Sequence, residues 1–387
     1  MTERTNTGRS RICFVATVPF VINVFLRPHI DVLKVDYDVV LVANGTSEDL
    51  PGLINGYVSF VPMPIERKIS IKSDVFALVS LWRLFRRERF TAVHSIMPKA
   101  GFLSMLAARL AGVRWRVHTF TGQVWATEKG FHRFVLKSFD RVLAMNATHL
   151  LTDSYSQRQF LIENKVANAA VIEVLAEGSF AGVNLERFTF SANARQQVRL
   201  RHRISDEAIT FLFLGRLNLA KGLTDLARAF AMAAAQDPLI HLLVVGPDEG
   251  GLETEFSALA QRFPERIHRA GFTDRPEDYI SAADVFCLPS HREGFGSVLI
   301  EAAAAGVPAI ASRIYGITDA VEDGVTGILH SVNSAPELAD AMLLLASDGE
   351  LRRRMGSAAR ARAMEKFSEA RVTRAFADFY RRILRSS

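Results

Sequence analysis

Two glutamates, Glu293 and Glu301, stand eight positions apart on either side of a glycine-rich segment. Gly294 and Gly296 permit backbone angles and a close approach that a side chain would prevent. A helix is predicted over residues 297–305, and its start leaves amide donors unpaired where a phosphate group fits. The carboxylates accept hydrogen bonds from hydroxyls, which a sugar nucleotide carries on both sides of its diphosphate. The segment therefore predicts a sugar-nucleotide site.

The spacing by itself leaves a structural alternative open. Glu301 is also an ordinary glutamate of an early helix turn, favoured by the helix dipole, and Glu293 is also a solvated loop charge. A second segment favours the site: Arg216 and Lys221 follow an apolar strand-like run over residues 210–214 and precede an amphipathic helix. Open α/β sheets bind ligands at the carboxyl ends of their strands, and both cations are common diphosphate partners. For each of them, surface solvation is the alternative.

Strand-like and helical segments alternate along the whole chain, in two series separated near residues 190–208. The first series of runs covers residues 12–16, 39–43, 57–61, 92–95, 116–119, 142–145 and 171–174. The second covers residues 210–214, 241–245, 266–269, 285–288, 309–311 and 327–330. Such alternation predicts an α/β fold of two doubly wound, Rossmann-like domains with parallel sheets, facing each other across a cleft. Residues 191–195 and the charged segment after them are predicted to be the linker.

Several motifs of the second series resemble the donor half of a retaining family-4 glycosyltransferase, a family with the GT-B fold. They are residues 215–217 with Lys221-Gly222, the Glu-x7-Glu segment, residues 306–312, Gly316, and residues 322–327. The resemblance is close over about residues 208–330. Earlier in the chain, residues 98–101, 121–127, 178–179 and 182–184 resemble the subgroup that builds capsule, exopolysaccharide or O-antigen repeat units on a lipid carrier.

The resemblance implies an acceptor-side domain over residues 1–192 and a donor-binding domain over residues 193–367, with a last helix at about residues 368–387 crossing back to the first domain. It implies transfer of a hexose or N-acetylhexosamine from a nucleotide diphosphate sugar, expected to be UDP-linked, to a lipid-linked saccharide acceptor. Two other classes stay open. A sugar-nucleotide epimerase would release an altered sugar without any acceptor, and a sugar-nucleotide-binding protein would show no turnover.

By the same resemblance, Glu293 holds hydroxyls of the donor sugar and Glu301 those of the ribose. Arg216 and Lys221 take up the charge of the departing diphosphate, so that neither a metal nor another cofactor is expected. The resemblance completes the donor-binding segment with Gly294, Phe295, Gly296, Ser297 and Val298.

His118 ends a strand-like run and is placed like a family histidine that touches the donor sugar, which makes it a candidate catalytic residue. A packed structural histidine is the alternative, because this chain has Thr121-Gly122 where many relatives have a His-Gly pair, and its first loop lacks the family's paired glycines. The sole Asp-x-Asp motif, residues 36–38, lies at a strand entry, where a turn is expected rather than a metal site. Cys13 and Cys287 fall in apolar runs and are expected to be buried.

The chain has 387 residues, 49% of them hydrophobic, and a net charge of +6. This size suggests two or three domains with sizeable cores. Residues 12–26 are expected to form a first strand, loop and helix rather than a signal peptide, because Pro19 and Asn23 interrupt them. No apolar run reaches the length of a membrane span, so a cytoplasmic location is expected. No nucleic-acid-binding module is recognised.

Much of the positive charge lies early in the chain, in a predicted amphipathic helix over residues 74–90. There Trp82 and Phe85 stand beside Arg83, Arg86, Arg87 and Arg89. Basic residues among aromatic ones suit an interfacial helix, which predicts peripheral attachment to the anionic inner face of the plasma membrane. A core-facing helix with a solvated basic end is the alternative.

Overall fold

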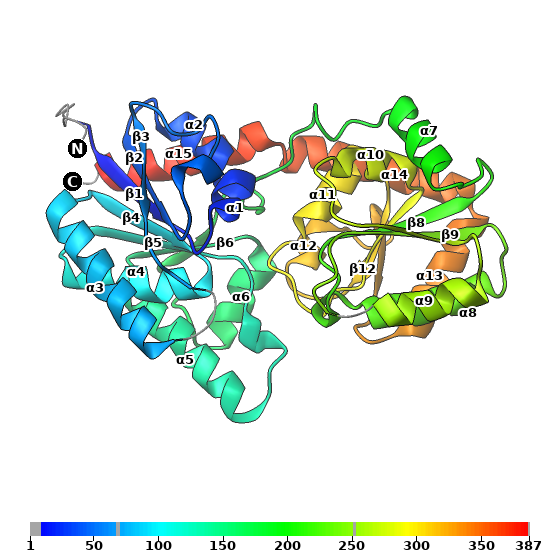
Figure 1. Ribbon diagram of the computed structural model, residues 1–387, viewed down its shortest axis with the longest axis horizontal. Helices are drawn as coiled ribbons and strands as arrows, with labels where there is room; N and C mark the ends of the chain where they lie inside the picture. The colour runs from blue at the N-terminus through cyan, green and yellow to red at the C-terminus, as the bar shows by residue number, and fades with distance from the viewer. Residues whose placement is uncertain (1–8, 67–69, 251–252, 386–387) are drawn as a thin grey trace. The chain divides into compact units, whose positions relative to one another are not determined.

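The structure is a computed structural model that describes residues 9–66, 70–250 and 253–385 (Figure 1). The chain divides into two compact units. One comprises Met1–Ala181 together with Ala370–Ser387, and the other comprises Gly182–Glu369. Each unit contains one parallel sheet with helices on both faces, so the predicted α/β class with two Rossmann-like sheets is confirmed.

The first unit has a seven-stranded parallel sheet in the order β3-β2-β1-β4-β5-β6-β7. Its strands are β1 (Arg11–Val15), β2 (Asp38–Ala43), β3 (Val58–Pro62), β4 (Ala92–Ile96), β5 (Trp115–Phe120), β6 (His149–Thr152) and β7 (Ile172–Val174). Side chains of successive strand residues point to opposite faces. Cys13 and Val15 pack in the core beneath the helices α3 (Ile71–Glu88), α4 (Pro98–Leu110) and α5 (Gly130–Asn146). Ile12 and Phe14 pack in the core on the other face.

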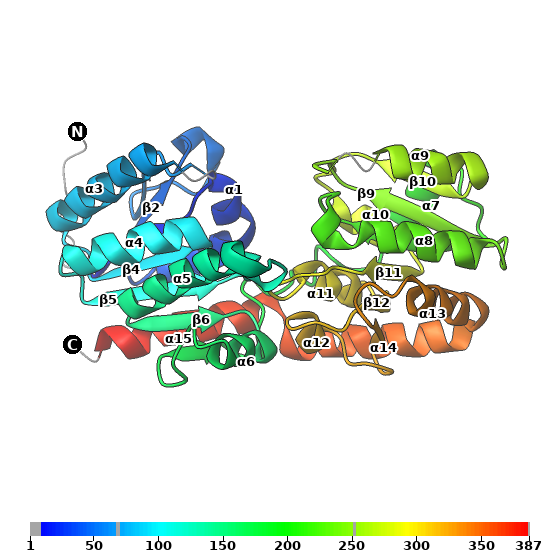
Figure 2. The ribbon, with the colours of Figure 1, turned by 90° about the horizontal axis from the view of Figure 1, so that it is seen from below.

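The remaining helices of the first unit include α1 (Pro19–Val21), a π-helical turn (Ile22–Leu26), α2 (Arg27–Leu33) and α6 (Tyr155–Glu163). The strand, loop and helix expected at residues 12–26 are thus present. Asp36 and Asp38 lie at the turn into β2, as predicted, and Asp38 is the first residue of that strand. Figure 2 shows α3, α4 and α5 as one layer on one face of the sheet, and α15 (Glu369–Arg385) lies on the opposite face.

The second unit has a six-stranded parallel sheet in the order β10-β9-β8-β11-β12-β13. The strands are β8 (Ile209–Leu214), β9 (Ile240–Val245), β10 (Ile267–Ala270), β11 (Val285–Leu288), β12 (Ala309–Ser312) and β13 (Gly327–His330). The helices are α7 (Ala192–Arg201), α8 (Leu223–Ala234), α9 (Glu253–Arg262), α10 (Pro276–Ala282), α11 (Ser297–Ala304), α12 (Ile317–Ala320), α13 (Ala335–Ser347) and α14 (Gly349–Lys366). In both sheets the strand order reverses beside the first strand, which puts the central loops together at one edge.

One predicted strand is wrong. Residues 142–145 belong to the last turns of α5, and the strand paired with β5 is β6, a few residues later. These residues form a helix in which Leu143 and Ala144 are buried while Met145 is 66% exposed. Such a pattern is typical of a helix that buries one face, and a central strand does not produce it. Each of the other twelve predicted runs coincides with a strand to within one residue at either end.

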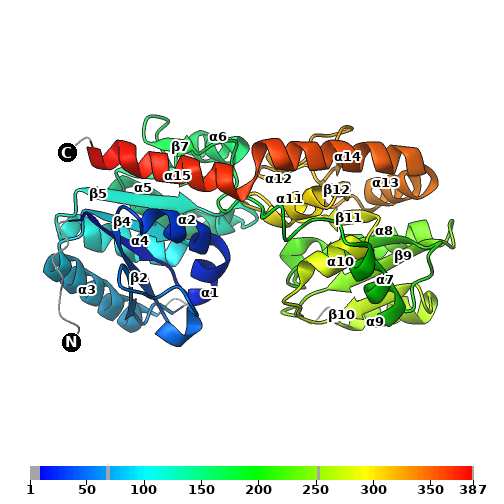
Figure 3. The same cartoon turned by 90° about the horizontal axis from the view of Figure 1, so that it is seen from above.

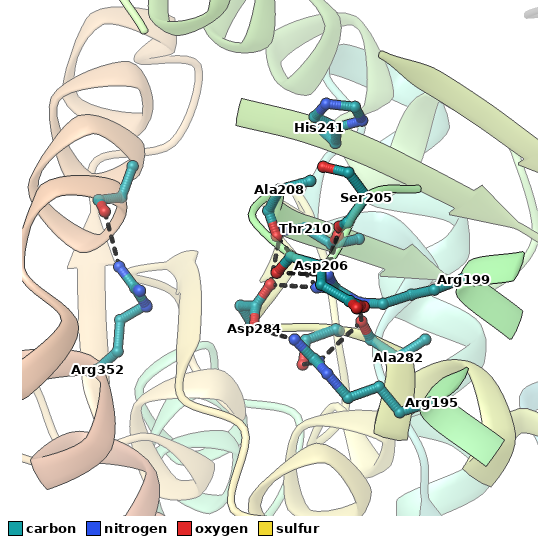
Figure 4. Close-up of polar contacts among 12 residues, drawn as sticks. Arg195, Arg199, Ser205, Asp206, Ala208, Thr210, His241, Ala282, Asp284 and Arg352 are labelled. Carbon is teal, nitrogen blue, oxygen red and sulfur yellow. Dashed lines mark hydrogen bonds and ion pairs between the residues drawn. The ribbon is translucent and has the colours of Figure 1, made fainter. Parts of the chain in front are cut away.

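The prediction of a linker that begins at residues 191–195 is also wrong, because this segment folds as the helix α7 of the second unit. The Ser191 hydroxyl caps this helix by accepting a hydrogen bond from the Ala194 amide at 3.2 Å. Arg195 and Arg199 on α7 each bind one oxygen of Asp284, at 2.8 and 2.7 Å (Figure 4). Arg199 is buried and also donates to backbone carbonyls, including those of Ala208 and Ala282, so its charge is fully solvated by the protein.

The last helix, α15, packs with the first unit, as the resemblance implied (Figure 3). Its Phe376 and Tyr380 lie in the core beside Phe14 of β1. The buried imidazole of His94 bonds the Tyr380 hydroxyl through Nδ1 and the Thr119 hydroxyl through Nε2, both at 2.8 Å. α15 is therefore held by a polar contact as well as by apolar packing.

Candidate active site

The loops that follow β8 and β11 are locked together by a close backbone approach. Gly222 stands between the short 3-10 turn Leu219–Lys221 and α8 with a φ of +69°. A Cβ at Gly222 would lie 1.9 Å from the carbonyl oxygen of Pro289, so no other residue fits there. The amide of His291 donates to the carbonyl of Ala220 at 2.9 Å. The sequence thus brings the loop that carries Lys221 against the loop that carries Glu293.

Lys221 and Glu293 form an ion pair between these loops, with 2.5 Å between Nζ and Oε1. Their side chains are 21% and 12% exposed, so the pair is partly shielded from water. The buried hydroxyl of Ser290 donates to the same carboxylate oxygen at 2.8 Å. Within the described residues, no hydrogen bond takes the second oxygen, Oε2. The pair places one donor-rich and one acceptor-only group side by side at the carboxyl ends of β8 and β11.

Ser290 and a second pair were missed by the sequence interpretation. His291 Nε2 lies 2.8 Å from Oδ2 of Asp225, the acidic residue in the first turn of α8, and this contact joins α8 to the loop after β11. The available signal was position: Ser290 and His291 follow directly after a buried strand, where sheet-edge sites collect. Asp225 gave no such signal, since an acidic residue is ordinary in a first helical turn.

Arg216 does not contact Lys221 or Glu293 but pairs with another acid. Its guanidinium bonds Glu249 at 3.0 Å, in the loop after β9, and its side chain is 58% exposed. Such an exposed pair contributes little to stability and can be exchanged at low cost. The structure therefore joins Lys221 to Glu293 but pairs the other predicted cation with a different acid.

The helix α11 begins as predicted at Ser297, after Gly296, which caps it in the left-handed conformation. The side chain of Phe295 is buried, and its ring packs on that of Phe367 with 5.3 Å between centroids. Gly294 is buried, and Ser297 and Val298 are partly exposed at the helix start. Because the Phe295 side chain is buried, a ligand at this segment would contact the backbone of Phe295 and the first-turn amides of α11.

Glu301 lies one turn into α11, and its carboxyl group is buried although the residue as a whole is partly exposed. Burial raises the pKa of its carboxyl to about 7, an effect that the negative charge of Glu277 reinforces and the positive charge of Arg187 opposes. Arg187 and Glu277 themselves form an ion pair at 3.0 Å. Hydrogen bonds from hydroxyl groups to this carboxylate would favour its charged form. Neither Arg187 nor Glu277 was singled out from the sequence.

His118 belongs to the first unit, on β5, and is buried. Its Nδ1 bonds the Ser95 hydroxyl at 2.9 Å, while Nε2 has no partner within the described residues. Burial lowers the pKa of the imidazole to about 3, so the ring is neutral at physiological pH. Any side chain on Gly101 would collide with the ring, since a Cβ there would lie 2.5 Å from Cε1. His118 is thus packed against α4, and its contact with a donor sugar stays a prediction.

Other candidate groups are resolved by the structure. Cys13 and Cys287 are buried and free, as predicted, and burial raises the pKa of both thiols. In the part of the chain that the structure describes, no three or more histidine, cysteine, aspartate and glutamate side chains are grouped so as to hold a metal ion. No helix of the described ranges has the length and apolar character that crossing a bilayer requires.

The predicted interfacial helix forms as α3, over Ile71–Glu88. Arg83, Arg86 and Arg87 are exposed on it, and Trp82 is partly so. Phe85, expected at the interface with Trp82, instead lies in the core, where its ring meets the edge of Phe90 at 6.0 Å between centroids. This part of the prediction is wrong, because Phe85 falls on the face of α3 that also buries Leu81 and Leu84.

Comparison with known proteins bears on both units. Residues 194–362 match the family described as glycosyl transferases group 1, and residues 34–178 match the glycosyl transferase 4-like domain. The chain is 28% identical over 365 residues to the capsular polysaccharide biosynthesis glycosyltransferase CapM of Staphylococcus aureus, covering 94% of each chain. It is 30% identical to the D-inositol 3-phosphate glycosyltransferase of Streptomyces bingchenggensis (strain BCW-1), covering 88% of this chain and 78% of the relative.

A third relative is the UDP-Gal:alpha-D-GlcNAc-diphosphoundecaprenol alpha-1,3-galactosyltransferase of Escherichia coli, which is 27% identical over 75% of this chain and 74% of its own. Among solved structures, Anabaena Alr3699/HepE in complex with UDP-glucose superposes with a TM-score of 0.77 over 96% of this chain and 99% of that one, at 18% identity. The last comparison concerns the fold alone. With both sheets, the loops after β8 and β11, and these matches, the chain belongs to the group 1 glycosyl transferases, the family-4 glycosyltransferases of GT-B fold.

Proposed function

We propose that this glycosyltransferase moves a hexose or N-acetylhexosamine from a UDP-linked sugar to a lipid-linked saccharide acceptor, with retention of anomeric configuration and without a metal ion. In this step the bond from the anomeric carbon to the diphosphate breaks and a bond to the acceptor oxygen forms. The acceptor's hydroxyl proton leaves with the diphosphate. The product would enter cell-surface polysaccharide synthesis at the cytoplasmic face of the membrane.

The observation that carries the proposal is the contact of Lys221 with Glu293. A diphosphate needs a cation and a sugar ring needs acceptors for its hydroxyls, and these two side chains supply both at one point. Ser290 fixes Oε1 of the carboxylate, which leaves Oε2 directed to a hydroxyl. As the leaving group separates, negative charge grows on the diphosphate, and Lys221 and Arg216 stabilise it electrostatically. Glu301, one turn into α11, is assigned to the ribose hydroxyls.

The nature of donor and acceptor is supported by the relatives. The Escherichia coli relative is named for a UDP-sugar donor and a lipid diphosphate acceptor, and the Staphylococcus aureus relative for capsular polysaccharide. The solved Anabaena protein holds UDP-glucose. Transfer of these properties to this chain is our proposal.

A donor panel followed by a turnover assay tests the proposal. Uridine, guanosine and adenosine diphosphate sugars are titrated first, and we expect a uridine diphosphate sugar to bind most tightly. That donor, radiolabelled in the sugar, is then incubated with membrane lipid extract, and we expect label in the lipid fraction. Release of a free altered sugar without extract would instead indicate an epimerase. Tight binding without turnover in any extract would indicate a binding protein.

A further inference from the structure

The candidate donor site of the second unit holds two cations, and each is paired with its own acid. Lys221 pairs with Glu293, and Arg216 pairs with Glu249 at 3.0 Å. These four side chains carry two positive and two negative charges, so they are neutral as a set. A nucleoside diphosphate adds further negative charge to this set. Charge balance therefore favours the release of one acid from its cation when a diphosphate binds.

The two ion pairs differ in how firmly they are held. Lys221 and Glu293 are largely shielded from water, and the Ser290 hydroxyl bonds the same carboxylate. The side chains of Arg216 and Glu249 are 58% and 42% exposed, and within the described residues neither makes another hydrogen bond or ion pair. An exposed pair contributes little free energy, whereas a shielded charge resists the loss of its partner. Arg216 is thus the cation that can change partners.

The backbone keeps Glu249 within reach of Arg216. The strands β8 and β9 are neighbours, and the loops that follow them continue side by side (Figure 1). The amide of Leu217 donates to the carbonyl of Pro247 at 2.8 Å, and the amide of Glu249 donates to the carbonyl of Leu217 at 3.0 Å. Because these backbone hydrogen bonds hold both loops, a change of partner by Arg216 requires only the rotation of side chains.

We propose that Glu249 is a positioning residue of the donor site, which holds Arg216 before a nucleotide binds and releases it to the diphosphate on binding. A guanidinium binds carboxylate and phosphate oxygens with the same planar fork, so one contact replaces the other without a covalent change. When the nucleoside diphosphate leaves, the carboxylate takes the guanidinium back. Glu249 thereby weakens nucleotide binding and speeds the release of the product. The inference rests on the proposed function, which places the diphosphate beside Arg216.

The expected effect has a defined direction and size. Breaking an exposed ion pair changes an equilibrium constant by roughly 1.5-fold to fivefold. Glu249→Gln removes the competing charge, so this variant should bind UDP about two- to fivefold more tightly than wild type. Loss of a merely structural contact, or partial unfolding, would weaken binding instead. The direction of the change therefore identifies the role of Glu249.

Calorimetric titration with UDP tests the proposal. Inorganic pyrophosphate is the second probe, since it carries the diphosphate without base or sugar. Arg216→Gln should weaken the binding of both probes, whereas Glu249→Gln should strengthen it. In the Arg216→Gln background, Glu249→Gln should have no further effect, because Glu249 acts through Arg216. Stopped-flow measurement should also show slower dissociation of UDP from Glu249→Gln than from wild type.

The matched control is Asp248→Asn. It removes one negative charge from the same loop and keeps the side-chain oxygen that accepts from the Gly250 amide. This variant should bind UDP like wild type. The proposal is overturned if Glu249→Gln binds UDP no more tightly than wild type. It is also overturned if Asp248→Asn tightens binding equally, or if the gain persists without Arg216, because the effect is then that of loop charge rather than of an exchange.

The transfer assay separates this inference from the proposed function. Tighter UDP binding by Glu249→Gln, without label in the lipid fraction from any extract, would refute the transfer reaction and leave the exchange standing. Label in the lipid fraction, together with unchanged UDP affinity in Glu249→Gln, would refute the exchange and leave the transfer reaction standing. If wild type binds neither UDP nor pyrophosphate, both are refuted.

Discussion

Lys221 and Glu293 form an ion pair between two loops. In the proposed reaction the positive charge of Lys221 also acts on the diphosphate of the donor, and the negative charge of Glu293 also acts on the hydroxyls of its sugar. Glu293→Gln keeps the shape of the side chain but removes the charge that strengthens hydroxyl hydrogen bonds. A charged hydrogen bond contributes roughly 1.5–3 kcal/mol, so turnover should fall about tenfold to hundredfold with the fold retained. Steady-state kinetics measure the loss and circular dichroism the fold. Glu365→Gln, an exposed change on α14, is the control, and equal rates for the two variants would remove Glu293 from the site.

The cation of the pair should matter most as the leaving group separates. Lys221→Ala should lower kcat by about a hundredfold or more, as the loss of a single preorganised electrostatic group does elsewhere, and should weaken donor binding much less. Comparing kcat with the Kd for the donor makes the distinction. An unchanged kcat would mean that the lysine serves only to pair with Glu293.

If Glu301 binds the ribose hydroxyls as proposed, donor binding should depend on pH in a defined direction. Its pKa of about 7 means that the carboxylate is about one-tenth ionised at pH 6 and about nine-tenths at pH 8. Only the ionised form accepts from two ribose hydroxyls, so donor affinity should rise roughly tenfold from pH 6 to pH 8. Calorimetric titration should also detect proton release on binding. Glu301→Gln should bind more weakly with a flat profile, and a rise of the same size in this variant would assign the titration to another group.

At the scale of the elements, α15 is the clearest case of a helix placed by contacts distant in sequence. Tyr380→Phe leaves Nδ1 of the buried His94 without its partner, which should lower the free energy of unfolding by about 1–3 kcal/mol. Denaturant unfolding, monitored through the transition of the first unit, measures this change in the free energy of unfolding. Tyr57→Phe, at an exposed position, should shift it by less than about 0.5 kcal/mol. Equal shifts would show that packing of the rings, rather than the hydrogen bond, holds α15.

For the whole molecule, the donor site is expected to work through side-chain cations and helix amides. Activity should therefore persist in excess chelator and should not rise with added magnesium or manganese. The measurement is transfer rate with and without EDTA, with a metal-dependent transferase assayed in parallel to show that the chelator is effective. Loss of activity in EDTA and its recovery with either ion would contradict the proposed electrostatic mechanism.

The sequence by itself determined most of the secondary structure and the positions of the candidate donor-binding residues beside it. Buried parallel strands such as β8 and β11 are continuous apolar runs, and Gly296 with the helix-forming residues after it fixes the start of α11 from local preferences alone. The spacing of Glu293 and Glu301 and the cations after β8 could be recognised because all of them lie next to such elements. The helix α5 and strand β6 were confused because a short apolar run fits either periodicity, and burial on one face decided between them.

Only the tertiary structure decided which groups meet. Lys221 pairs with Glu293, whereas Arg216 pairs with Glu249. These pairings depend on how the loops after β8, β9 and β11 pack, and no local sequence preference encodes that packing. The same holds for the raised pKa of Glu301, which burial causes, and for Phe85, whose place on α3 relative to the core turned an expected interfacial residue into a buried one. Spacing along the chain specifies the faces of an element. Burial and pairing arise from what packs against those faces, and these partners are distant in sequence.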